Sequence, residues 1–418
     1  MRRGIALLLL CLTGNCAAQA PGDALELPPT PLVETALAAY PPVRAAREGV
    51  RFEQAGKRRL EAGPYEFAIR GGYQSHTLPN GRFPEFELGL ERALRLPEKA
   101  RLDRELGVQG VELARRIAYS AWCEGARHLL QLWYAWAREN MQLTLWTQQA
   151  QALREQVGVV SRRAAAGDAP RVEVNFAEAS AAQAEAVVEN FRGREQGARA
   201  ALDRTFPAIP VPAVARIGRP RPLEQDLDWF VDQVRLHNDE IRVARAAARR
   251  GLMVARRAGA ERLPDPSLGV RIATDRSNAD RVAGLFVVVP IPGDARRAFA
   301  DGARAQAAVA ASQEAAVVQR VTADVAQMHG QATGAFRAWE KARSAADGMQ
   351  RNAASTLRSW QLREASLSEV LIARRLAIES SLTAALAQID AEETRYRLLI
   401  EAHILWNDPE EEAAPHED

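Results

Sequence analysis

The chain has 418 residues, of which 47% are hydrophobic and 26% charged, with 55 basic residues against 53 acidic ones. This composition is too apolar and too balanced in charge for a disordered protein, and its arginines are scattered among acids, so we expect no nucleic-acid partner. The length allows one large domain or two to three ordinary ones.

The first twenty residues have the features of a secretion signal. Two arginines near the start precede an apolar core at residues 5–12 and several small residues. That core is too short to cross a bilayer, so we predict a signal peptide at residues 1–20. Two alternatives stay open: a cut after Ala18, because proline follows residue 20, and lipidation at Cys16.

Removal of this signal leaves Cys123 as the only cysteine. An exported chain with one thiol has no internal disulfide, so packing must hold the fold. No two of the six histidines lie within four residues of each other, and Cys123 has no local partner. The sequence therefore predicts no metal site, and we expect neither a cofactor nor catalysis, since no hydrolase or metalloprotease motif occurs.

Proline placement shows where long helices are permitted. Proline-free stretches cover 98–169, 171–206, 223–263 and 293–408, and an interior proline would cost about 3 kcal/mol in a helix. A helix over 98–163 would be about 100 Å long. Apolar or small residues in it recur at the three-and-four spacing of a coiled-coil seam. The seam comprises Ala118, Trp122, Gly125, Leu129, Leu132 and Trp136, and we interpret Trp122, Trp133, Trp136 and Trp146 as packing residues.

Two segments alternate apolar and polar residues with a period of two, which predicts β-hairpins at 65–92 and 267–291. Each strand has about 9 to 11 residues, the length that crosses an outer membrane when tilted. One face of the hairpins is apolar, and we expect it to contact lipid. The residues expected on this face are Phe67, Ile69, Tyr73, Phe86, Leu88, Leu90, Leu268, Val270 and Ile272.

The two halves of the chain repeat one order of elements. Residues 21–221 and 222–406 each predict a helix, a hairpin and two long helices, and the long helices meet at tips near 164–171 and 361–368. A period of about 195 residues is too long for a solenoid unit, so it indicates a duplicated module. We expect the acidic end, 407–418, to be a disordered tail.

Local sequences within this order resemble the outer membrane efflux protein family, the TolC-like outer membrane factors. Residues 32–46 are similar to that family's first helix, and residues 167–185 and 365–387 to its two tip segments. Residues 96–101 and 289–292 resemble the heavy-metal branch, which exports cobalt, zinc and cadmium.

This resemblance implies a mainly α fold with a membrane β-barrel contribution. A homotrimer would share a twelve-stranded barrel in outer-membrane lipid, with four strands per subunit, and a long α-helical coiled-coil barrel in the periplasm. The implied function is passive conduction in a tripartite efflux system of a Gram-negative bacterium. Metal cations or small toxic compounds would pass from an inner-membrane pump of the resistance-nodulation-division class, through a periplasmic adaptor, to the exterior.

The resemblance also suggests roles for the tips. Asp168, Arg363 and Glu364 would form an entrance gate, although charges at a turn are commonly just solvated. Several tip residues would contact the adaptor; helix capping is the alternative interpretation of these residues, with Asp168 as a cap and Gly167 as a left-handed C-cap, and the two interpretations are compatible. The residues expected to contact the adaptor are Arg163, Gly167, Asp168, Val174, Leu367 and Val370.

The competing interpretation is a soluble periplasmic coiled-coil adaptor or scaffold without a pore. Such a protein would have to cover the apolar face of both hairpins, for example by packing them on helices. The exposure of that face therefore separates the two interpretations.

Overall fold

The computed structural model describes residues 27–79, 81–275 and 280–409. The predicted signal peptide, most of the turn of the second hairpin, and the acidic tail beyond residue 409 lie outside the described residues. The first half contains α1 (Thr30–Ala39), α2 (Pro41–Ala62), β1 (Ala68–Leu78), β2 (Gly81–Ala93), α3 (Pro97–Ala165) and α4 (Arg171–Thr205). The second half contains α5 (Leu227–His237), α6 (Asp239–Ala260), β3 (Ser267–Asp275), β4 (Asp280–Val288), α7 (Asp294–Gln361) and α8 (Leu367–Glu401).

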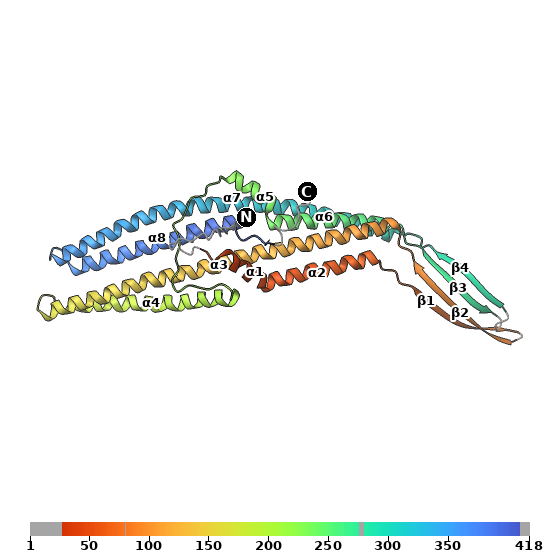
Figure 1. Ribbon diagram of the computed structural model, residues 1–418, viewed down its shortest axis with the longest axis horizontal. Helices are drawn as coiled ribbons and strands as arrows, with labels where there is room; N and C mark the ends of the chain where they lie inside the picture. The colour runs from red at the N-terminus through yellow and green to blue at the C-terminus, as the bar shows by residue number, and fades with distance from the viewer. Residues whose placement is uncertain (1–26, 80, 276–279, 410–418) are drawn as a thin grey trace, which may run out of the picture.

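The molecule is long and narrow, with helical tips at one end and a sheet at the other (Figure 1). Its two longest helices, α3 and α7, have 69 and 68 residues, which corresponds to about 100 Å each. Helices α2 and α4 pack on α3, and helices α6 and α8 pack on α7. The two halves therefore have one architecture, which confirms the predicted class of long helices with four strands and an internal repeat.

Local sequence signals set the ends of these helices. Helix α3 starts with Pro97, whose missing N–H costs nothing in a first turn. Helix α6 starts after Asn238, whose side-chain oxygen accepts a hydrogen bond from the Ile241 amide at 3.2 Å. Helix α8 starts with a capping box between Ser366 and Glu369.

One antiparallel sheet joins the two halves. Its strand order is β1-β2-β3-β4, so β2 of the first repeat pairs directly with β3 of the second. Leu88 lies opposite Gly71 on β1 and Ile272 on β3, which places alternate residues of the three strands on one face. Among the described strands, β1 and β4 each pair with one neighbour and form the two edges.

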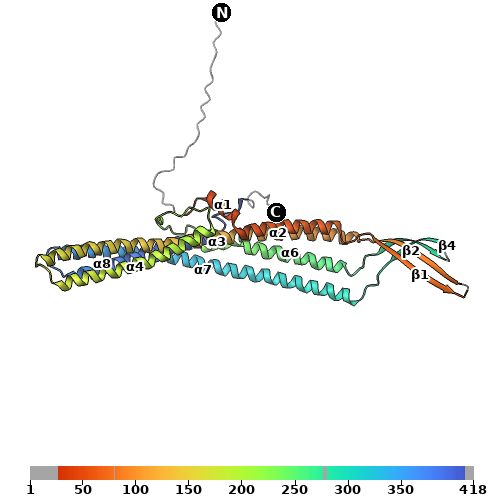
Figure 2. The ribbon, with the colours of Figure 1, turned by 90° about the horizontal axis from the view of Figure 1, so that it is seen from below.

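The main apolar core lies midway along the molecule, where α1, α3, α8 and the segment after α4 meet. The side chains of Trp122, Trp133 and Trp136 are at most 3% exposed there, which confirms that they are packing residues. Trp146 is partly buried in a second cluster nearer the tips. In the perpendicular view, the helix pairs continue from this centre to the tips while the sheet leaves from the opposite end (Figure 2). Over the described residues, no helix combines the length and the apolarity that a membrane span requires.

Candidate functional site

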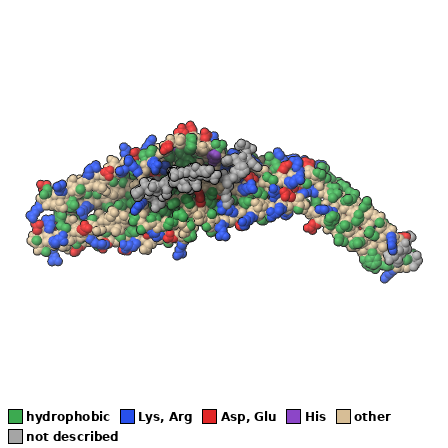
Figure 3. Space-filling view, in the orientation of Figure 1, with side chains coloured by type: hydrophobic (Ala, Val, Ile, Leu, Met, Phe, Trp, Pro, Cys, Tyr) green, Lys and Arg blue, Asp and Glu red, His purple; other side chains and the backbone are tan. Residues whose placement is uncertain are grey.

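One face of the sheet is apolar from edge to edge. The predicted residues of β1, β2 and β3 lie on this face, and their side chains are 40–76% exposed in the single chain. Phe67 immediately precedes β1 and is also exposed. Leu285 and Val287 of β4 lie opposite Val270 and Leu268, and so extend the face to the last strand. Hydrophobic side chains cover the strands in the space-filling view, whereas charged side chains are frequent over the helices (Figure 3).

The opposite face of the sheet is polar. Arg70 pairs with Glu91 at 3.0 Å, and the Gln74 amide donates to the Glu85 carboxylate at 2.7 Å. Such cross-strand pairs fix the register of β1 against β2. No other element of the described chain packs on either face of this sheet. Such a sheet is suited to a position where its apolar face contacts lipid and its charged face contacts water.

A buried ionic cluster fastens the sheet to the helices. The Lys99 side chain, at the start of α3, is 1% exposed, and its ammonium lies 2.7 Å from Glu261 and 3.1 Å from Asp265. Asp265, just before β3, also accepts hydrogen bonds from the Tyr65 hydroxyl and from the Leu96 amide at 3.0 Å. These residues border both hairpins, so the cluster ties the two hairpins to α3 and α6.

The pKa values in this cluster follow from its geometry. Burial alone would raise the pKa of Asp265, but the hydrogen bonds from Tyr65, Leu96 and Lys99 hold it below the usual value. Burial and the Asp265 carboxylate raise the pKa of Tyr65 to about 12. At neutral pH, Asp265 is therefore an ionised carboxylate. The Lys99 ammonium balances its charge, and the Tyr65 hydroxyl donates a hydrogen bond to it.

The two tips have the same backbone turn with different residues. Gly167 follows α3 with φ of +76°, and Arg363 follows α7 with φ of +66°. The next amide in each tip, of Asp168 or Glu364, donates to a carbonyl five residues earlier at 2.8 Å. Helices α3 and α7 therefore both end at a residue in the left-handed backbone conformation. Arg363 carries the conformational strain that glycine avoids, of order 1–2 kcal/mol.

An acidic residue of the first tip links it to the second. The Asp168 carboxylate lies 3.2 Å from the Arg163 guanidinium of its own tip and 3.2 Å from that of Arg363. Arg163 also lies over the Trp360 ring, 4.9 Å from the ring centre. The structure thus brings together Arg163, Asp168 and Arg363, whereas Glu364 is exposed beside them.

Two residues expected to contact the adaptor are buried inside the chain. Leu367 is 2% and Val370 0% exposed, and both belong to the apolar cluster between α3, α4, α7 and α8. Their side chains hold the tips together in this conformation and offer no surface to a partner. Val174 is partly buried against the same cluster, and Gly167 is exposed.

The structure also shows exposed apolar residues near the tips that were missed in the sequence. Val172, Phe176, Leu362 and Ile372 are 50–68% exposed. Phe176 and Ile372 line a groove of about 370 Å³ together with residues of α3, α4 and α8. Helical periodicity assigns such residues to a core face, because it does not show how many helices cover each face.

One group of possible metal ligands lies elsewhere, at the middle of the molecule. Within the described parts of the chain, donor atoms of Cys123, Asp239 and His403 all lie within 4.8 Å of one another. The three residues come from α3, from the start of α6 and from the segment after α8. Spacing along the sequence could not reveal this group.

Comparison with known proteins identifies structures that share this fold. No protein-family model and no curated protein sequence matches this chain. Solved structures do match along nearly its whole length. The outer membrane protein VceC of Vibrio cholerae has a TM-score of 0.72 at 16% identity, with 90% of this chain and 95% of VceC covered.

Two further structures agree. The CmeC outer membrane channel of Campylobacter jejuni has a TM-score of 0.73 at 11% identity and covers 91% of this chain and 86% of its own. The open state of the MtrE outer membrane channel of Neisseria gonorrhoeae has a TM-score of 0.70 at 15% identity, with 91% and 89% covered. The chain therefore has the TolC-like fold of these outer membrane channels, as its sequence predicted.

Proposed function

We propose that three copies of this chain form a channel in the outer membrane of a Gram-negative bacterium. The observation that carries the proposal is the apolar sheet face, which nothing in the described chain covers. On a protein in water this face would be an aggregation hazard, whereas against lipid the same surface is stable.

The open edges of the sheet support a closed assembly. Strands β1 and β4 each have one described neighbour, and an unpaired edge in hydrocarbon costs several kcal/mol for each unsatisfied backbone group. Pairing β4 of one copy with β1 of the next would remove both edges. Three copies then give twelve strands, and the helices of the three copies continue the tube into the periplasm.

The channel conducts passively and has no catalytic role. An inner-membrane pump of the resistance-nodulation-division class delivers the cargo through a periplasmic adaptor, and the cargo is a metal cation or a small toxic compound. We retain the two repeats, 21–221 and 222–406, as the units of the subunit. The exposed or partly exposed tip residues are the proposed adaptor contacts, namely Arg163, Gly167, Asp168 and Val174.

The direct test is single-channel conductance of the purified mature protein in a planar bilayer, together with its mass in detergent. Stable conductance steps from a species of three subunits are expected. A monomer that stays dispersed without detergent and never conducts would instead support a soluble periplasmic scaffold without a pore.

A charge on the apolar face should block membrane assembly. Leu88 lies near the middle of β2, and arginine at the bilayer midplane costs about 2–4 kcal/mol. Leu88→Arg is therefore expected to reduce the amount of trimer in outer-membrane fractions. The matched control is Gln74→Arg, which places the same side chain on the polar face beside Glu85. Equal loss of trimer in both variants would contradict the assignment of the faces.

The link between the tips is proposed to hold the entrance closed. Asp168 joins Arg163 to Arg363, so the two helical hairpins cannot separate without breaking an ion pair. Glu364 adds negative charge beside it at the proposed gate.

Removing this charge should favour the open state. Only the exposed pair of Asp168 with Arg363 joins the two tips, and such a pair contributes about 0.2–1 kcal/mol, so Asp168→Asn is expected to raise the ratio of open to closed tips about 1.4- to 5-fold per subunit. The measurement is open probability in planar bilayers. Glu173→Gln removes a nearby charge from the same tip and serves as the control. Unchanged gating in Asp168→Asn would exclude Asp168 from the gate.

A further inference from the structure

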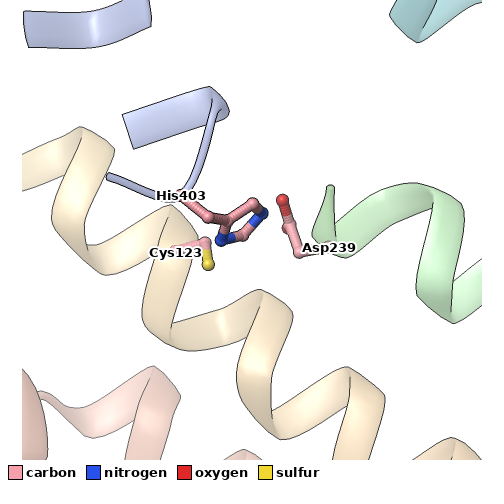
Figure 4. A group of neighbouring side chains, drawn as sticks. All are labelled: Cys123, Asp239 and His403. Carbon is pink, nitrogen blue, oxygen red and sulfur yellow. The ribbon is translucent and has the colours of Figure 1, made fainter. Parts of the chain in front are cut away.

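The side chains of Cys123, Asp239 and His403 converge at the junction of the two repeats. Cys123 lies on α3, Asp239 is the first residue of α6, and His403 follows the end of α8. The imidazole of His403 lies between the sulfur of Cys123 and the carboxylate of Asp239 (Figure 4). Three chain segments that are far apart in the sequence thus present one donor atom each to the same small volume.

The spacing of these donors suits a metal ion. Donors bound to a tetrahedral Zn²⁺ at its usual bond lengths lie about 3.3–3.8 Å apart. The observed separations of up to 4.8 Å require a contraction of about 1 Å, which rotation of side chains can supply. Sulfur, imidazole nitrogen and carboxylate oxygen together form a ligand set typical of Zn²⁺ rather than of Mg²⁺ or Ca²⁺.

The environment of His403 prepares it as a ligand. The Tyr119 hydroxyl is 2.7 Å from Nδ1, and the two rings are stacked with centres 5.5 Å apart. The other ring nitrogen, Nε2, is buried and has no hydrogen-bond partner among the residues that the structure describes. Because Tyr119 holds Nδ1, Nε2 stays available to an ion, as in known metal sites.

Asp239 is held rigidly beside this ring. Its carboxylate accepts hydrogen bonds from the Ser120 hydroxyl at 2.7 Å and from the Arg127 guanidinium at 3.1 Å. Arg127 also contacts Glu401 at 3.2 Å, so it keeps an anionic partner when Asp239 binds a cation.

The charges around the group allow a dication. Arg127 and Arg242 face it as cations, and Asp239 and Glu401 face it as anions. Burial and the Asp239 carboxylate raise the pKa of the Cys123 thiol, so the metal-free group holds this proton. Binding of Zn²⁺ would form the Zn–S bond and release the thiol proton to solvent, so half of the added charge is compensated.

We propose that each subunit binds one Zn²⁺ ion through Cys123, Asp239 and His403, with a water molecule in the fourth position. Cys123 and Asp239 are buried and His403 is partly buried, so we assign the ion a resident structural role rather than that of transported cargo. It fastens the C-terminal segment and the second repeat to α3 of the first. This proposal departs from the sequence-based expectation of no metal site, and it does not depend on the channel role.

Cobalt substitution tests the proposal on the purified mature protein. Because Cys123 is the only cysteine beyond residue 16, a thiolate-to-cobalt charge-transfer band can come from this residue alone. Co²⁺ is expected to bind at one ion per chain with this band, and Zn²⁺ to displace it. Absence of the band from the wild-type protein would overturn the proposal without any variant.

Three variants assign the ligands. Cys123→Ser should abolish the band, and His403→Gln should reduce it together with the affinity for Co²⁺. Tyr119→Phe removes a positioning group and should weaken Co²⁺ binding about 10- to 100-fold. The control is His128→Gln, because His128 contacts Tyr40 outside the group. Zn²⁺ should raise the midpoint of thermal unfolding of the wild type and of the control more than that of the three variants, and equal binding by all variants would exclude the site.

Discussion

Replacement of Lys99 by methionine is expected to lower the free energy of unfolding by about 3–5 kcal/mol. Methionine retains the length of the apolar stem but removes the ammonium that contacts Glu261 and Asp265. The Asp265 side chain is only 3% exposed, so water cannot replace the lost charge. A buried carboxylate without a counter-ion is among the most costly defects in a folded chain. The measurement is thermal or denaturant unfolding, followed by circular dichroism in detergent.

A second substitution separates charge from packing. In the double variant Lys99→Met with Asp265→Asn, the buried anion is absent, so most of the lost stability should return. The asparagine introduced by Asp265→Asn would keep a side-chain oxygen to accept from the Leu96 amide, which donates to Asp265 in the native protein. If the double variant is as unstable as the single one, the stem of Lys99 rather than its charge supports the joint.

The sequence predicted those parts of the fold that depend on local patterns. The alternation in β1 to β3 placed Leu88 and its neighbours on one face, and the register confirms that face. The spacing of Trp122, Leu129 and Trp136 predicted their burial, because three-and-four spacing keeps them on one side of α3. Family resemblance added the TolC-like arrangement of these elements, which the structural comparison supports.

Features that depend on long-range contacts were not predictable. Lys99 meets Asp265, and Cys123 meets His403, only after the two repeats have packed together. Leu367 and Val370 lie in a predicted tip segment, yet they are buried in an apolar cluster that α8 shares with three other helices. The sequence shows which residues share a helix face but not which other segments cover that face, so their burial could not be inferred.

Trp136 belongs to a buried hydrogen-bond network beside the linker between the two repeats. Its indole N–H donates to Glu195 of α4 at 3.0 Å, and Asn140 donates to the same carboxylate at 3.3 Å. Arg199 also contacts Glu195 and donates to the carbonyls of Val211 and Pro212 in the linker. The linker after α4 therefore lies against α3 through a buried polar network around one tryptophan.

Trp136→Ala is accordingly expected to cost about 3–5 kcal/mol of unfolding free energy, because it opens a cavity and removes a donor to buried Glu195. Trp136→Phe fills most of the volume and removes only the N–H, so about 1–3 kcal/mol is expected. Trp146→Ala is the control at a partly buried position and should cost less than Trp136→Ala. The midpoints of urea unfolding in detergent should fall in that order. Equal losses for Trp136→Ala and Trp136→Phe would assign the effect to the hydrogen bond with Glu195. A negligible loss for Trp136→Phe would show that Asn140 and Arg199 satisfy that carboxylate without the indole.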